Sequence, residues 1–273
     1  MTTKLIILIV ISLQMISCKN EKTTFSSADI ALYSDKGAWD QSVTALENMF
    51  QWMGMSTALI DADYINNNSL DGFKIICFPG GDMYQYSQDI SETGKEKIRS
   101  FVRNGGGYIG ICGGAYFASE TVIWQGNQLP MTPLSLFKGS AEGTINAIVP
   151  YPQRGMCQVN IVDTVHAITH SISTPQWILY YWGPVLKPNT SETTVLGKYN
   201  AVNQPAILAF DYGLGKVFIT GTHPEIEEDS DRDGVVFADT VINGTSYLGE
   251  DKLDDKGSDW DLMKKATNWC IRH

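Results

Sequence analysis

Residues 106–117 are Gly106-Gly107-Tyr108-Ile109-Gly110-Ile111-Cys112-Gly113-Gly114-Ala115-Tyr116-Phe117. Here an apolar strand over Tyr108–Ile111 runs into a cysteine with the G-x-C-x-G spacing of a nucleophile elbow, the sharp turn from a strand into a helix. Small residues are needed because this turn is crowded. The elbow presents its side chain at the end of the strand, beside backbone N–H groups that favour negative charge. Because a free thiol is only slightly ionised at neutral pH, this setting would help Cys112 to react.

The segments before the elbow predict alternating strands and helices. Asp40–Met53 and Ser91–Asn104 carry apolar residues at helical spacing, and Ser91 is placed as an amino-terminal cap. Apolar strands that alternate with amphipathic helices imply a parallel sheet covered on both faces. We therefore predict an α/β fold, a flavodoxin-like three-layer α/β/α sandwich with a mostly parallel central sheet. The predicted strands are Asp29–Tyr33, Ser56–Ile60, Lys74–Phe78 and Tyr108–Ile111.

The pattern changes after the elbow. From Thr121 to about Lys198, short segments separated by Pro, Gly and Asn predict an antiparallel β excursion. The aromatic residues between Trp177 and Trp182 are expected to fill its core, with a pocket lining as the alternative. The main sheet should then resume. The strands predicted in this half are Ile145–Val149, Gln158–Val162, Trp177–Tyr181, Ala206–Phe210 and Lys216–Thr220, and a helix capped by Ser258 should run to Ile271 and bury Leu262, Met263, Ala266 and Trp269.

Two further motifs follow strand ends. Gly221-Thr222-His223-Pro224-Glu225 comes directly after the strand that ends at Thr220. Pro224 biases His223 toward extended backbone, in which residues two apart point the same way, so Glu225 can hold one imidazole nitrogen while the other faces the thiol. Phe78-Pro79-Gly80-Gly81-Asp82 ends a neighbouring strand and can turn backbone N–H groups toward an oxyanion. Ligands of such sheets bind at the carboxyl ends of the strands, where all three motifs lie.

A strand ending in P-G-G, an elbow G-x-C-x-G and a late H-P-E, in this order, resemble the class I glutamine-amidotransferase-like domains. The stretch from Phe101 to Phe117 is most similar to the amino-terminal domain of biotin-protein ligases and its stand-alone bacterial relatives, and the resemblance covers about residues 29–228. It implies that Cys112 is the nucleophile, His223 the general base and later acid, and Glu225 the residue that orients the imidazole. It also implies oxyanion donors at Gly81 and Gly113, and substrate contacts at Gly80, Asp82, Gly114 and Tyr116.

The context argues against an ammonia-transfer reaction. A true amidotransferase passes ammonia to a synthetase, whereas neither a synthetase nor a biotin-ligase catalytic domain is recognised here, and an exported protein lacks ready ATP. Hydrolysis of a small amide or peptide through a thioester is the expected chemistry, similar to that of the exported gamma-glutamyl hydrolases, and no cofactor is expected. The alternative is a catalytically silent binding or scaffold lipoprotein that keeps the fold and the pocket.

The first residues have the layout of an export signal. Lys4 precedes an apolar run from Leu5 to Leu13, which is too short to span a bilayer, and Met15-Ile16-Ser17-Cys18 resembles the lipobox of bacterial lipoproteins. We expect a signal peptide over residues 1–17, a lipidated Cys18 with a tether over 18–27, and one domain over 28–273. The protein would then be anchored to the cell envelope, periplasmic or at the outer membrane. An ordinary secretory signal is the alternative.

The chain is acidic. Its formal charge of −10 becomes −11 when Lys4, the only charged residue before Cys18, leaves with the signal. Nucleic acid is therefore not an expected partner, because an acidic protein repels phosphates. Of the remaining thiols, Cys77 lies in an apolar run and is expected in the core, and no disulfide pairing is predicted for it, Cys112, Cys157 or Cys270.

Two patterns resemble metal-binding motifs, but each lacks a feature that such a site needs. Asp229, Asp231, Asp233 and Gly234 begin like a calcium loop, but its twelfth position is Thr240, which cannot give the bidentate carboxylate. The run is expected to be a solvated acidic loop or the start of a helix, with a border of the substrate cleft as the alternative. His166 and His170 are four apart, but their neighbours favour extended structure. No metal site is predicted.

Overall fold

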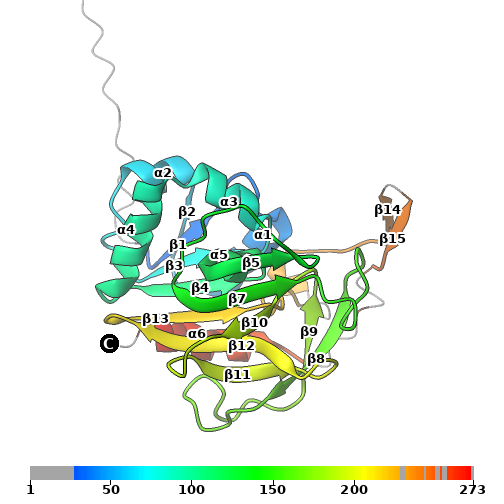
Figure 1. Cartoon of the computed structure of the whole chain (residues 1–273). Coiled ribbons are helices and arrows are strands. Elements are labelled where there is room, and N and C mark those ends of the chain that lie inside the picture. The colour runs from blue at the N-terminus through cyan, green and yellow to red at the C-terminus, as the bar shows by residue number, and fades with distance from the viewer. Residues whose placement is uncertain (1–27, 228–230, 243, 250–252, 254–256, 272–273) are drawn as a thin grey trace, which may run out of the picture.

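The computed structural model describes residues 28–227, 231–242, 244–249, 253 and 257–271. Its centre is a nine-stranded sheet with the order β2-β1-β3-β4-β13-β12-β11-β8-β9 (Figure 1). The first five strands are parallel, and the other four extend the sheet with antiparallel pairs. The parallel strands are β1 (Ile30–Tyr33), β2 (Thr57–Ile60), β3 (Ile75–Phe78), β4 (Gly107–Ile111) and β13 (Gly215–Thr220), and the others are β12 (Gln204–Tyr212), β11 (Thr194–Tyr199), β8 (Gly155–Ile161) and β9 (Gln176–Tyr180).

The two faces of the parallel strands belong to two separate cores. In β1, Ala31 and Tyr33 face one core while Ile30 and Leu32 face the other, and all four are fully buried. Such strands are apolar throughout because both of their faces are covered. The helices that cover them are α1 (Asp40–Trp52) and α6 (Trp260–Ile271) on one face, and α2 (Ala62–Asn67), α3 (Met83–Asp89), α4 (Glu92–Arg103) and α5 (Gly113–Ala118) on the other.

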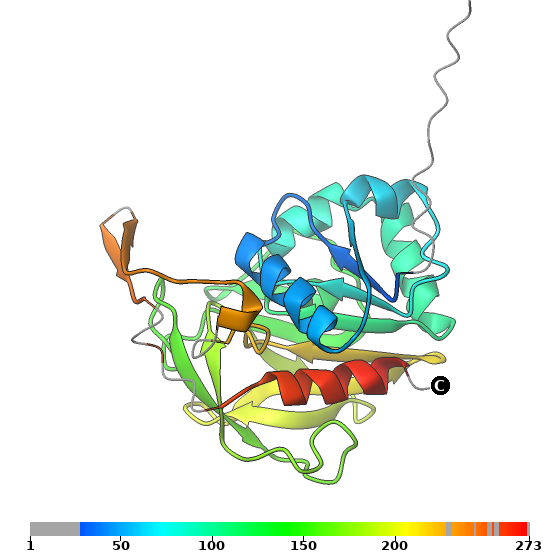
Figure 2. The same cartoon turned by 180° about the vertical axis from the view of Figure 1, so that it is seen from behind.

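Figure 2 shows α1 in blue and α6 in red on the same side of the sheet. Leu46, Met49 and Phe50 of α1 and Met263 of α6 are buried there, as helical spacing predicts. Ser91 caps α4 by accepting a hydrogen bond from the Gly94 amide at 3.1 Å. These layers confirm the predicted three-layer α/β class.

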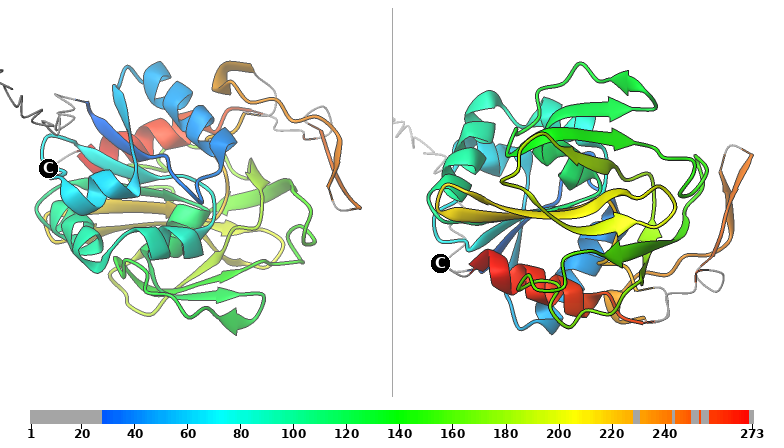
Figure 3. Two further views of the ribbon diagram at one scale, coloured as in Figure 1. Left: turned by 90° about the horizontal axis from the view of Figure 1, so that it is seen from above. Right: turned by 60° about the horizontal axis from the view of Figure 1, so that its bottom comes forward.

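A second, four-stranded sheet packs on the face that α3 to α5 cover. Phe137 and Leu186 of this sheet join the same core as Leu208 and Phe210 of β12. A short hairpin projects from the body in every view (Figures 1, 2 and 3). The sheet consists of β5 (Ser119–Trp124), β6 (Asn127–Gln128), β7 (Phe137–Gly143) and β10 (Val185–Pro188), and the hairpin of β14 (Thr240–Ile242) and β15 (Thr245–Tyr247), preceded by a 3-10 turn, η1 (Asp231–Asp233).

Three details differ from the sequence predictions. Residues Ile145–Val149 form a turn rather than a strand, because Pro150 and Pro152 follow and interrupt a ladder. The excursion is not a separate antiparallel unit: β5 and β7 pair in parallel, and β8 and β9 join the main sheet. Trp269 is only partly buried, against the His166 ring.

The predicted signal peptide, Cys18 and the tether lie outside the described residues. Within the described ranges, no helix is both long enough and apolar enough to cross a membrane.

Candidate active site

Three loops meet at the carboxyl edge of the parallel strands. Cys112 directly follows β4, His223 follows β13 and Gly81 follows β3, and these strands are neighbours in the sheet. Cys112 has φ 45° and ψ −98°, in the left-handed half of the map that a residue with a Cβ rarely adopts. This strained turn points the thiol out of the strand direction, and its amide is held by the Thr220 carbonyl at 2.8 Å.

The glycines of the elbow let two loops approach closely. A Cβ on Gly113 would lie 2.3 Å from the Gly81 carbonyl oxygen, and one on Gly114 would lie 2.2 Å from that of Phe78. The Gly114 amide donates to the Pro79 carbonyl at 3.1 Å. The G-G pairs at 80–81 and 113–114 are therefore needed for packing of the elbow against the P-G-G loop.

A buried polar network joins His223 to the other loops. The imidazole Nδ1 lies 2.9 Å from Glu225 Oε1, and the Ser42 hydroxyl donates to the same oxygen at 2.6 Å. Ser42 Oγ in turn accepts the Gly80 amide at 2.9 Å. Both side chains of the pair are almost fully buried, and the indole of Trp260 in α6 donates to the Glu225 carbonyl at 2.9 Å. The network thus links the P-G-G loop, α1, α6 and the H-P-E segment.

Burial and charge act in opposite directions on His223. Burial alone lowers the pKa of the imidazole, since it disfavours the charged form, but the nearby Glu225 carboxylate and the Cys112 sulfur in its charged form outweigh it and raise the pKa to about 10. The imidazole therefore keeps its proton at neutral pH. The direction follows from the short contact to Glu225, which is itself fully buried.

The second ring nitrogen faces the cysteine side of the site. His223 Nε2 is buried and has no hydrogen-bond partner among the described residues, while Cys112 is close enough to contribute to the pKa of the ring. Cys112 Sγ lies 3.5 Å from the carbonyl oxygen of Tyr181, to which the thiol can donate. No described residue accepts a hydrogen bond from the amide of Gly81 or Gly113. The Gly81 amide lies on the cavity lining and is available to a bound oxyanion, whereas Gly113 is buried and does not line the cavity.

Cys112 and His223 open onto one cavity of about 670 Å³. Trp39 packs edge-on against the His223 ring, with centroids 5.1 Å apart, and Tyr116 is held by its hydroxyl to the Trp182 carbonyl at 3.0 Å. A cavity of this size is typical of small-molecule sites. Its lining comprises Gly37, Trp39, Gly81, Asp82, Met83, Tyr84, Cys112, Tyr116, Trp124, Leu129, Tyr181, Trp182 and His223.

The structure brings most of the predicted site residues to this cavity. Four of them do not line it. Glu225 is buried against the imidazole Nδ1, Gly80 lies against the same ring, Gly113 packs against Gly81, and Gly114 packs against Phe78. Sequence reasoning missed Ser42 and Trp39, which the start of α1 carries into the site. It also expected the aromatic residues from 177 to 182 in the core. Tyr180 is there, fully buried, but Tyr181 and Trp182 line the cavity because the chain leaves β9 at Tyr180 and turns across the elbow.

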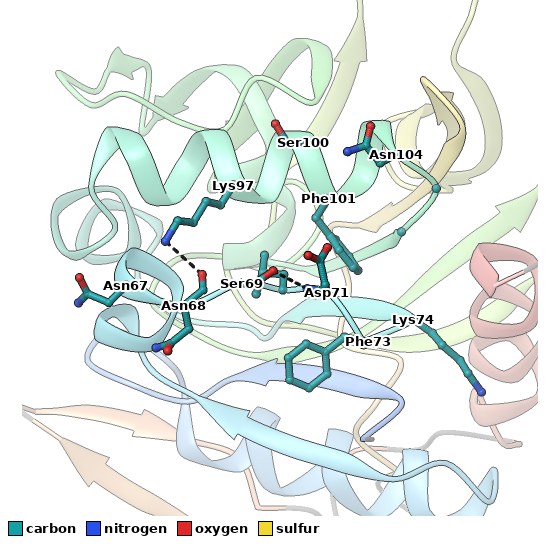
Figure 4. A pocket seen from close by; sticks show the side chains of 14 residues that line it. Asn67, Asn68, Ser69, Asp71, Phe73, Lys74, Lys97, Ser100, Phe101 and Asn104 are labelled. Carbon is teal, nitrogen blue, oxygen red and sulfur yellow. Dashed lines mark hydrogen bonds between the residues drawn. The ribbon is translucent and has the colours of Figure 1, made fainter. Parts of the chain in front are cut away.

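A second hollow lies at the opposite edge of the sheet, just before β3 and β4 (Figure 4). Several of its polar groups are paired within the protein. The Lys97 ammonium donates to the carbonyl oxygens of Asn66 at 2.7 Å and Asn68 at 3.1 Å, and Ser69 Oγ accepts the Asp71 amide. This hollow therefore contains no arrangement comparable to the one around Cys112.

Among the described residues, the acidic run, the histidine pair and the other cysteines noted in the sequence do not line the cavity. Asp229 lies outside the described residues, whereas Asp233 is buried and its two carboxylate oxygens accept the amides of Glu227 and Val235. His166 and His170 lie in a turn rather than on a regular helix. Among the described residues there is no cluster of three metal-ligating side chains, and Cys77, Cys112, Cys157 and Cys270 are free thiols. Cys77 is fully buried, which raises the pKa of its thiol.

Two curated proteins are similar in sequence. The biotin–protein ligase of Schizosaccharomyces pombe is 28% identical over 168 residues, which cover 57% of this chain and 26% of that protein. An uncharacterized protein of Chlamydia muridarum is 30% identical over 97 residues, which cover 32% of this chain and 36% of that protein. The matches thus span about a quarter to a third of the length of these relatives.

Solved structures share the fold at low sequence identity. A ThuA-like protein of Bacteroides uniformis superposes with a TM-score of 0.53 at 13% identity, covering 93% of this chain and 95% of that one. A Thermoplasma acidophilum protein, provisionally assigned to GMP synthase, gives 0.52 at 12% identity, covering 89% of this chain and 94% of that one. The family model described as "Biotin-protein ligase, N terminal" matches residues 28–244. The chain therefore belongs to the biotin-protein ligase N-terminal family, with the glutamine-amidotransferase-like fold that its three motifs predict.

Proposed function

We propose that this protein is a cysteine-dependent amide hydrolase with Cys112 as nucleophile, His223 as proton carrier and Glu225 as the residue that orients His223. The observation that carries the proposal is the imidazole fixed at Nδ1 by a buried carboxylate while its free Nε2 and the thiol of a strained elbow share one cavity. A purely structural histidine would have both nitrogens satisfied by the protein.

The reaction would proceed in two halves. The Cys112 thiolate attacks the amide carbonyl carbon, and the resulting oxyanion accepts hydrogen bonds from the amides of Gly81 and Gly113. His223 then gives its proton to the amine nitrogen, the C–N bond breaks, and a thioester remains on Cys112. Water, deprotonated by His223, attacks the thioester, and the carboxylic acid leaves with the thiol regenerated.

Selective alkylation tests the nucleophile. With iodoacetamide near neutral pH and peptide mapping by mass spectrometry, Cys112 should be modified much faster than Cys77, which is fully buried and serves as the internal control. The His223→Ala variant should slow modification of Cys112. Equal and sluggish labelling of both thiols would end the proposal.

Turnover separates the enzyme from a silent binding protein of the same fold. Wild type and Cys112→Ala are incubated with a panel of primary amides and small peptides, and ammonia or amine release is measured. Release that requires Cys112 supports the hydrolase. A wild-type protein that binds panel members without any release would favour the scaffold alternative.

We also propose export and lipid attachment at Cys18, for which the support is the sequence of residues 1–18 alone. The matched domain begins at residue 28, after the proposed tether. Mass spectrometry of the mature amino terminus should find a diacylated Cys18. An unmodified terminus, or one that starts at another residue, would refute the anchor.

A further inference from the structure

We infer that the site takes amides whose groups next to the scissile bond are aromatic or alkyl and carry no carboxylate. This rests on the proposed hydrolase function and names its substrate class. It excludes free glutamine and γ-glutamyl peptides, because both carry an α-carboxylate a few bonds from the amide.

An aromatic wall runs around one side of Cys112. The ring centroids of Trp39 and Tyr181 are 5.3 Å apart, those of Tyr181 and Trp182 are 4.6 Å apart, and those of Trp182 and Trp124 are 6.4 Å apart. Tyr116 closes the series at 5.9 Å from Trp124. These rings come from four separate segments of the chain, so the tertiary fold, and no single local motif, forms the wall. Such faces favour flat or apolar groups, which gain from leaving water.

Apart from His223, whose proton the proposed reaction uses, the described lining of the cavity carries no cation that could hold a carboxylate. None of the described residues that line it is Lys or Arg. The one acidic side chain of the lining, Asp82, is exposed at the rim, and its Oδ1 accepts the Tyr84 amide at 2.9 Å. A carboxylate on the groups beside the scissile amide, which must leave His223 to the reacting atoms, would therefore meet the like charge of Asp82 and lose hydration without gaining a partner.

Arg154 is the cation to consider outside the lining, because Arg154 and Tyr181 lie close enough to influence each other's pKa. Its guanidinium stands over the Phe237 ring at 4.2 Å, and both Nε and Nη2 donate to the Leu248 carbonyl oxygen. The guanidinium of Arg154 is thus already paired with an aromatic ring and a carbonyl oxygen. The pairing with Phe237, which itself stacks on Trp39, makes it a support for the wall rather than an anion receptor.

Binding to the Cys112→Ala protein tests the inference without requiring turnover. Hydrocinnamamide carries a phenyl ring, glutaramate carries a carboxylate on a chain of similar reach, and L-glutamine carries the α-carboxylate and α-ammonium. By calorimetry, hydrocinnamamide should bind about tenfold or more tightly than glutaramate or L-glutamine, as burial of an aromatic ring predicts. Equal or tighter binding of either carboxylate ligand, or no binding of hydrocinnamamide, would overturn the inference.

Two variants locate the preference. Trp182→Ala should weaken hydrocinnamamide binding by about tenfold because the wall loses its central ring, whereas Trp52→Ala, at an exposed position outside the cavity, is the matched control. Asp82→Asn keeps the cap acceptor but removes the charge, so glutaramate binding should increase and become less dependent on salt. An unchanged ligand preference in both variants would contradict the inference.

Ammonia release from hydrocinnamamide by the wild-type protein is measured in parallel. Release that is lost in Cys112→Ala supports both proposals. Tight hydrocinnamamide binding with no release defeats the proposed hydrolysis and leaves the ligand preference standing. Release from glutaramate in preference to hydrocinnamamide defeats the substrate class and leaves the hydrolysis standing.

Discussion

Gly80 makes the position of the imidazole testable. An added Cβ would lie 2.4 Å from Cε1 and 3.1 Å from Nδ1 of His223, directly against the ring. Real Cβ atoms essentially never approach below 3.0 Å, and ordinary contact begins at 3.4 Å, so the ring or the loop must move by 0.6 Å (3.0 minus 2.4) to 1.0 Å (3.4 minus 2.4). The ring cannot yield freely, because Glu225 holds Nδ1 and the Leu179 carbonyl holds the His223 amide at 2.9 Å.

The Gly80→Ala protein should therefore lose about 10²-fold in kcat/KM for amide hydrolysis, the effect of a displacement of roughly 1 Å in a catalytic group. Its free energy of unfolding in urea should fall by only about 1–3 kcal/mol, as for other overpacked sites. Gly155→Ala is the matched control, because its Cβ would lie 3.4 Å from a Val149 methyl group, in ordinary contact. If Gly80→Ala folds and hydrolyses amides at the wild-type rate, the imidazole is not the group that does the chemistry.

Three further changes probe the network around Glu225. Ser42→Ala should lower the free energy of unfolding in urea by about 1–3 kcal/mol, because it leaves a buried carboxylate oxygen and the Gly80 amide without this hydroxyl; an unchanged denaturation midpoint would contradict the network. Glu225→Gln should lower the pKa of His223, seen by NMR titration. Because the raised pKa gives stability that is complete below about 6.5 and is lost as pH rises toward about 10, the excess stability of wild type over Glu225→Gln should shrink across that interval; a growing excess would reverse the sign of the argument. Cys112→Ala should also lower the pKa of His223, since the thiol raises it; an unshifted titration would place the sulfur too far from the ring.

The fold was largely predictable because its signals are local. Ser91 caps a helix of amphipathic spacing, and the strands of the parallel half are short apolar runs, of which β3, β4 and β13 each lead into one of the three motifs. Long-range strand pairing could not be predicted. Strand β8 pairs with β11, which lies more than thirty residues later in the chain, and β9 then joins the main sheet by pairing with β8. The helix α2 spans six residues, which is too short for a period of 3.6 to stand out.

The residues of the candidate site also fall into two groups, those that local sequence predicts and those that tertiary packing brings in. Cys112, His223 and Gly81 were predictable because each must directly follow a strand, and the required neighbours stand beside them in the sequence. Ser42 and Trp39 were not, because they enter the site through the packing of α1 on the sheet. One clue was present: Ser42 shares the inward face of α1 with Leu46 and Met49, where a polar residue needs a buried partner.

The burial of Glu225 determines how the reaction would begin. One carboxylate oxygen accepts from both Ser42 and His223, and the other has no hydrogen-bond partner among the described residues. A buried carboxylate with so few donors is costly unless a cation lies beside it. The protonated imidazole meets this need, so the contact that stabilises the fold also keeps the proton on His223. We therefore expect His223 to hold its proton before an amide binds, so that the proton is already placed for the leaving amine nitrogen.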